Sequence, residues 1–183
     1  ETQSVVPGLA KEWEWVDDTH CKFRLRDDVI MSDGTPLVAD DVVYTVGVWL
    51  EMCSSNDIGQ YIDPAGAVAN DEHTVTIGFS TKAPDILVLI AGAAYGIYTE
   101  DEVKAAGGLE AVGRNPVLGS GKYKFKEWVP GQYVVVERNE NYWDKDYTGY
   151  FKEIKFSFIA ESSSRVMTVL SGDAQVAHSI PVS

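Results

Sequence analysis

Hydrophobic and polar positions alternate with a period of two residues in several short stretches of the chain. Such alternation is typical of strands that bury one face and expose the other. It predicts a hairpin from residues 12–16 and 21–26, because two aspartates supply a turn between them. It also predicts strands over residues 72–80 and 151–159, and a short strand that ends near Val68.

The most patterned run is NPVLGSGKYKFKEWVPGQYVVVERNENYW, residues 115–143. Two stretches rich in aromatic and β-branched residues lie on either side of the Pro130-Gly131 pair, and this arrangement predicts a second hairpin. Large apolar side chains follow directly after it, at Tyr142 and Trp143.

Apolar residues on one side predict helices over residues 38–52 and 162–170. Pro84 near a helix start and the Gly107-Gly108 stop predict short helices over residues 85–91 and 100–106. Ser162 is expected to cap the helix over residues 162–170, and a short strand is expected after it, over Ala174 to Ala177. Val38 has no side-chain oxygen to accept the first amide hydrogens of its helix. We therefore expect that helix to begin less stably, by roughly 1 kcal/mol.

The composition is that of a globular protein: 45% of the 183 residues are hydrophobic and 23% are charged. This length supports one good core or two small subdomains. The net charge of −13 argues against a nucleic-acid partner and against an anionic membrane surface. The chain begins Glu1-Thr2-Gln3, so we expect that a leader was removed or that the chain is an excised piece.

The sequence shows no catalytic, metal or cofactor motif. The glycines around Ser120 lack the rest of a dinucleotide or phosphate loop and predict a turn. His73 has no second ligand at metal spacing. The neighbouring acids at 27–28 and 40–41 point apart on a strand or helix, so they are poor candidates for paired catalytic carboxylates.

Three blocks of the sequence resemble one protein family. They are residues 115–143, FRLRDDVIMSDGTPLVADDVVYTV (residues 23–46) and YFKEIKFSFIAESSSRVMTVLSGDAQVAHSIP (residues 150–181). Together they resemble the extracytoplasmic solute-binding proteins of ABC importers, in the family that holds the oligopeptide, dipeptide and nickel binders. Its pattern reads approximately G-T-G-P-Y-x-F, W-x-P-G and E-R-N-x-x-Y-W; here Ser120 replaces the Thr and Lys122 the Pro.

The resemblance implies an α+β (mixed α/β) fold: a lobe of the type II periplasmic-binding-protein kind with an extra small subdomain. Residues 1–112 would form the extra subdomain and residues 113–183 part of the first main lobe. The second lobe would lie outside this chain. The location implied is extracytoplasmic, in the periplasm or membrane-anchored on the outer face of the cytoplasmic membrane.

The function implied is capture of peptides or a similar small solute and delivery to ABC permease subunits, with no enzymatic activity and no cofactor. A sensor of the same fold without transport, or an extracytoplasmic hydrolase, are the alternatives. By approximate alignment with the family, Tyr61, His178 and Ser179 are the candidate ligand contacts. Cys21 and Cys53 form either a disulfide or two separate buried thiols.

Overall fold

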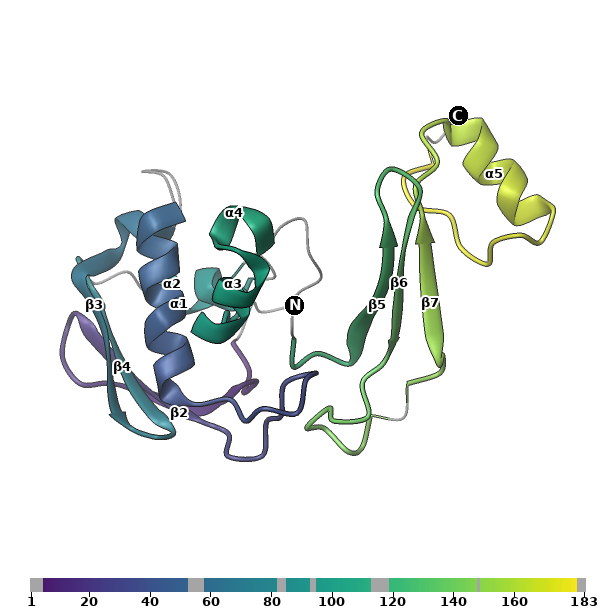
Figure 1. The fold of residues 1–183 in the computed structure, drawn as a ribbon. Coiled ribbons are helices and arrows are strands. Elements are labelled where there is room, and N and C mark those ends of the chain that lie inside the picture. The colour runs from purple at the N-terminus through teal and green to yellow at the C-terminus, as the bar shows by residue number, and fades with distance from the viewer. Residues whose placement is uncertain are drawn as a thin grey trace.

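The structure is a computed structural model that describes residues 5–52, 58–81, 85–92, 95–112, 119–147 and 149–180. Two regions follow one another along the chain (Figure 1). The N-terminal region, residues 5–112, holds a four-stranded sheet and the helices that accompany it. The C-terminal region, residues 119–180, holds a three-stranded sheet followed by one helix.

The first sheet is antiparallel with the strand order β1-β2-β4-β3. The strands are β1 (Ala10–Trp15), β2 (His20–Leu25), β3 (Ile62–Asp71) and β4 (Thr74–Phe79). The predicted first hairpin is therefore confirmed. The sequence predicts only the end of β3, because Pro64 and Gly66 interrupt its alternation. An edge strand tolerates both residues, since the pairing with β4 shifts register between Ile62 and Ala67.

Helix α1 (Ala39–Met52) confirms the first predicted helix and covers one face of this sheet. Its apolar residues Val42, Val46 and Trp49 are buried against alternate residues of the two central strands. The strand residues in this core are Cys21, Phe23, Leu25, Val75, Ile77 and Phe79. Asp41 Oδ2 accepts a hydrogen bond of 3.0 Å from the Val38 N–H. This bond supplies half of a capping box, and the weaker helix start stays a prediction.

Shorter helices complete the N-terminal region: η1 (Ile58–Gln60), α2 (Ile86–Ile90), α3 (Glu100–Ala106) and α4 (Leu109–Val112). The sequence predicts α2 and α3 but not α4. At the start of α3 the Thr99 hydroxyl accepts the Glu102 N–H at 3.2 Å. At its end Gly107 takes a left-handed conformation with φ of 95°.

The C-terminal region contains β5 (Tyr123–Val129), β6 (Tyr133–Arg138) and β7 (Glu153–Ser157), paired antiparallel in that order, and then α5 (Ser162–Leu170). The second predicted hairpin and the last helix are confirmed. Two expectations are wrong. Glu161, not Ser162, occupies the N-cap of α5, and no side chain caps this helix. Residues 174–177 form no strand, because the Ala174 N–H donates to the Thr168 carbonyl and closes the helix end instead.

A second, smaller core joins the two regions. Val29, Met31 and Leu37 are buried in it, and Trp143 packs against them from the C-terminal region. The Arg26 guanidinium lies 4.2 Å from the centroid of the Trp143 ring. A backbone hydrogen bond also links the two regions here, since the Ser32 N–H donates to the Gly119 carbonyl at 2.9 Å. We call this contact the junction.

Candidate functional site

The exposed face of the first sheet carries a groove of about 760 Å³. Antiparallel register places Glu12 opposite Arg24 and Glu14 opposite Lys22, with the side chains turned away from α1. The two pairs form cross-strand ion pairs of 3.1 and 2.7 Å between nitrogen and oxygen. Arg24 and Lys22 therefore each already pair with a carboxylate. Exposed ion pairs of this kind contribute about 0–1 kcal/mol to the free energy of unfolding.

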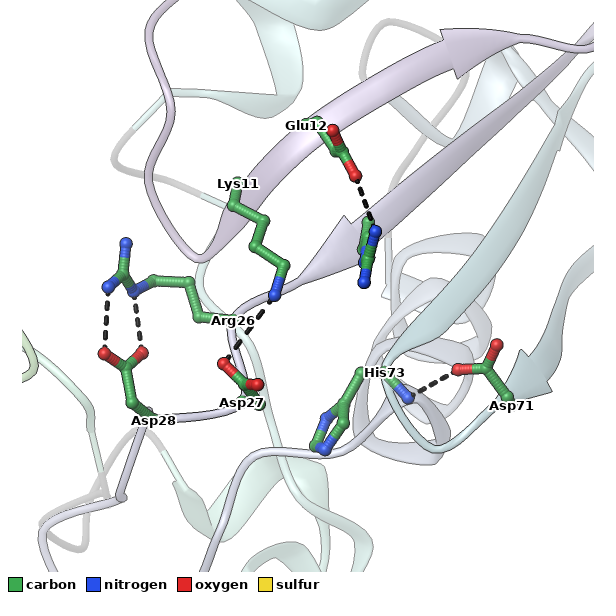
Figure 2. A network of polar contacts seen from close by, with 8 residues as sticks. Lys11, Glu12, Arg26, Asp27, Asp28, Asp71 and His73 are labelled. Carbon is green, nitrogen blue, oxygen red and sulfur yellow. Dashed lines mark hydrogen bonds and ion pairs between the residues drawn. The ribbon is translucent and has the colours of Figure 1, made fainter.

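At one end of the groove the acids are held by separate partners (Figure 2). Lys11 lies 3.6 Å from Asp27, and Arg26 donates two hydrogen bonds to the Asp28 carboxylate. The hydrogen bond from the Arg26 side chain lowers the pKa of Asp28. The acids at 27–28 therefore point to different bases, as the sequence predicts, and do not form a proton-transfer pair.

His73 lies in the turn between β3 and β4 at the same end of the groove. Its backbone N–H donates to Asp71 Oδ1 at 2.9 Å, and this bond lowers the pKa of Asp71 (Figure 2). The His73 carbonyl accepts the Leu25 N–H at 2.7 Å, which ties the turn to β2. Within the described part of the chain no group of three or more His, Cys, Asp or Glu could hold a metal ion. The position of His73 fits the turn that the sequence predicts.

Tyr61 lies directly before β3 and is half-buried at the edge of the main core. Its backbone is fixed on both sides, because its N–H donates to the Ile58 carbonyl and its carbonyl accepts the Ser80 N–H. Because Tyr61 is only partly buried against the core, part of its side chain stays available to solvent.

His178 and Ser179 follow α5 and are both exposed. The Ser179 Oγ lies 2.7 Å from the His178 Nδ1, so the two side chains form one hydrogen-bonded pair. Figure 1 places the segment after α5 at the opposite end of the molecule from β3. The structure thus brings His178 and Ser179 together but does not bring Tyr61 to them.

Sequence reasoning missed the residue that holds this pair in place. The Arg165 guanidinium donates to the Ile159 and Ala160 carbonyls, both at 2.7 Å, and to the Ser179 carbonyl at 2.8 Å. An arginine at this point belongs to the third block of resemblance, and that was its only signal in the sequence.

Cys21 is fully buried in β2 and is a free thiol. Burial raises the pKa of this thiol to about 11, so the reactive thiolate is scarce at neutral pH. This state of Cys21 fits the second of the two alternatives, two separate buried thiols. Cys53 lies outside the described residues, so the choice between that alternative and a disulfide stays a prediction. No helix of the described residues is long and apolar enough to cross a membrane.

Comparison with known proteins gives a consistent result. The family model of bacterial extracellular solute-binding proteins, family 5, matches residues 4–183. The chain is 28% identical to the periplasmic murein peptide-binding protein MppA of Escherichia coli over 199 residues, covering 99% of this chain and 36% of that protein. It is 31% identical to the periplasmic oligopeptide-binding protein OppA of Salmonella typhimurium, covering 75% of this chain and 28% of that protein. The chain thus spans about a third of the length of these relatives.

Solved structures agree. The Escherichia coli murein tripeptide binding protein MppA superposes with a TM-score of 0.79 at 28% identity, over 92% of this chain and 36% of that one. NikZ from Campylobacter jejuni, solved with Ni(L-His), superposes with a TM-score of 0.75 at 25% identity, over 91% of this chain and 33% of that one. These likenesses confirm the predicted mixed α/β architecture, a lobe of the type II periplasmic-binding-protein kind.

Proposed function

The chain belongs to the bacterial extracellular solute-binding proteins of family 5, and from this membership we propose that it is part of the ligand-binding component of an ABC importer. In this proposal the protein captures peptides or a similar small solute outside the cytoplasmic membrane and passes it to permease subunits. It catalyses no reaction. The match over residues 4–183 carries the proposal.

We propose that the chain divides near residue 112 into the extra subdomain, residues 1–112, and part of the first main lobe, residues 113–183. The separate sheets of the two regions support this division. Ligand would bind between this lobe and a second lobe, with a hinge movement that closes both on it. Tyr61 would offer a stacking surface, and His178 and Ser179 would offer hydrogen bonds.

The test is calorimetry on the complete gene product with a set of di- to pentapeptides. We expect binding by the complete protein and little or none by residues 1–183 alone, because half of a cleft buries only half of a ligand. Submicromolar affinity of the isolated 183 residues would contradict the two-lobed site. Absence of binding to every peptide would turn the ligand search to metal chelates, since NikZ was solved with Ni(L-His).

Variants then test the proposed contacts. His178→Ala and Ser179→Ala should each weaken peptide binding by about tenfold, the effect of one lost hydrogen bond of about 1.4 kcal/mol. Tyr61→Ala should weaken it by a similar factor through lost stacking. Tyr150→Ala is the matched control, because Tyr150 is 99% exposed and its substitution removes no packing in this chain.

A further inference from the structure

The Arg165 side chain ties three carbonyl groups from two separate segments together. Two carbonyls belong to Ile159 and Ala160, directly after β7, and the third belongs to Ser179, which lies 14 residues beyond Arg165. Hydrogen bonds from a charged donor are shorter and stronger than neutral ones, and the planar guanidinium fixes their directions. Arg165 therefore sets where the segment after α5 lies relative to the end of β7.

Ser179 needs such support. Its φ of 56° makes it the one residue other than glycine with a positive φ in the described part of the chain. The left-handed conformation brings the Cβ of an L-residue too close to its own carbonyl oxygen, so it persists only where neighbours hold it. The bond from Arg165 acts on that same carbonyl, at 2.8 Å.

The side chains presented by this backbone have a defined hydrogen-bonding character. A neutral His178 carries its proton either on Nδ1 or on Nε2. In the first case Nδ1–H donates to the Ser179 Oγ, and the hydroxyl hydrogen stays available. In the second case the hydroxyl donates to Nδ1, and Nε2–H stays available. Either way one donor remains free, which suits a ligand oxygen that accepts, such as a carboxylate or a peptide carbonyl.

We infer that Arg165 is a positioning residue of the ligand site: it holds Ser179 in its left-handed conformation and so presents the free donor of the His178–Ser179 pair to a carboxylate or carbonyl oxygen of the ligand. This inference rests on the proposed function. In this inference Arg165 acts through the backbone, because its two terminal nitrogens donate to the Ile159, Ala160 and Ser179 carbonyls.

Arg138 provides a matched control in the same region. It also donates to backbone carbonyls, at Gly149 and Phe151, and like Arg165 it has a buried Nε without a partner. Its carbonyls belong to the connection between β6 and β7, away from the His178–Ser179 segment. A merely structural role for Arg165 would therefore be reproduced by Arg138→Ala.

The first measurement needs no ligand. Nitrogen-15 NMR of the histidine side chains in residues 1–183 reports the hydrogen bond at His178 Nδ1. Arg165→Ala should abolish the spectroscopic signature of this hydrogen bond, whereas Arg138→Ala should leave the signature unchanged. Should Arg165→Ala fail to fold, Arg165→Lys is the second variant. It keeps the charge but lacks the planar guanidinium that reaches three carbonyls at once, so it should weaken the same signature. An unchanged His178 spectrum in both Arg165 variants would overturn the inference.

The second measurement is a double-mutant cycle in the complete gene product, with tri-L-alanine and the murein tripeptide as probes. Arg165→Ala and Ser179→Ala should each weaken binding about tenfold, and the double variant should be no weaker than either single one. Independent, multiplying losses of about a hundredfold would overturn the inference, as would an equal loss in Arg138→Ala. Failure of the unmodified protein to bind either probe would count against a peptide as the ligand, while the NMR result would still decide the positioning role.

Discussion

The two regions of the molecule differ sharply in how much apolar surface they bury. In the N-terminal region α1 closes over a sheet whose central strands contribute fully buried side chains such as Val46 and Val75. In the described part of the C-terminal region, Val135 is the one buried apolar side chain. Large apolar side chains stay exposed there instead, including Phe151, Phe156, Phe158, Met167 and Leu170.

This difference indicates which interactions stabilise each region. The N-terminal region has a hydrophobic core of its own, the dominant favourable term in folding. The C-terminal region relies on strand pairing, on arginine-to-carbonyl bonds and on the junction at Trp143. The residues proposed for ligand binding after α5, His178 and Ser179, lie in this second region.

The strongest test of this comparison uses two phenylalanines. Phe79 is 1% exposed in β4, whereas Phe156 is 53% exposed in β7. Phe79→Ala leaves a cavity and should lower the free energy of unfolding by about 3–5 kcal/mol. Phe156→Ala should lower it by about 0.5 kcal/mol or less. Urea unfolding of residues 1–183, monitored by circular dichroism, measures both changes in the free energy of unfolding. Losses of similar size would show that the C-terminal region has a core comparable to the first.

A second test breaks the junction. Trp143→Ala removes a half-buried ring from the small core and its contact with the Arg26 guanidinium. We expect a loss of about 1–3 kcal/mol, less than for a fully buried aromatic. Hydrogen exchange should show the loss mainly in β6 and β7, because the C-terminal region depends on this contact.

Trp15→Ala is the control for the junction. Trp15 packs on Phe79 at 5.6 Å between ring centroids, within the N-terminal region. Its removal should lower protection in the first sheet and spare β6 and β7. If Trp143→Ala lowered protection equally in both regions, the C-terminal region would not depend on the junction in particular.

Helix capping gives a third, smaller contrast. The Thr99 hydroxyl caps α3 of the N-terminal region, and Thr99→Ala should lower the free energy of unfolding by about 1 kcal/mol. Ser162 stands at the start of α5 without a capping bond, so Ser162→Ala should change it by about 0.5 kcal/mol or less. Thermal unfolding of both variants measures the difference. A loss for Ser162→Ala as large as that for Thr99→Ala would assign a stabilising contact to Ser162.

Much of the fold could be predicted from periodicity. Alternation is strong in β2, and the apolar stripe of α1 is regular, so these two elements were predicted close to their observed bounds. The hairpin of β5 and β6 was predicted from its dense aromatic and β-branched residues on either side of Pro130-Gly131. Pro64 and Gly66 obscured β3, because its edge position, which tolerates them, is a property of the folded sheet. The expected strand at 174–177 failed because an apolar run cannot reveal whether a neighbouring strand is present to pair with it.

The candidate site was predictable only in part. His178 and Ser179 were reached through the resemblance to the family, since isolated polar residues in a short segment carry no signal of their own. The role of Arg165 could not be predicted, because its partners are backbone carbonyls, and every residue has one. Such contacts depend on which segments the fold brings together, and the sequence pattern does not contain that information.

The smallest predicted effect concerns the β1–β2 turn of the N-terminal region. The Thr19 N–H donates to the Asp17 carboxylate at 2.7 Å, and this bond, with the His20 side chain, lowers the pKa of Asp17 from 3.8 to about 2. Since the folded pKa lies below the unfolded value, the carboxylate stabilises the fold above about pH 4 and loses this contribution as pH falls through 2.

Asp17→Asn keeps an oxygen that accepts the same backbone bonds but carries no charge. The difference in free energy of unfolding between the parent chain and Asp17→Asn should therefore be constant above about pH 5 and should shrink as pH falls towards 2. Urea unfolding across this pH range measures it. Thr19→Ala is the control, because it keeps the backbone N–H that is the main cause of the lowered pKa. If Thr19→Ala removed the pH dependence, the hydroxyl and not the backbone of this turn would hold the charge.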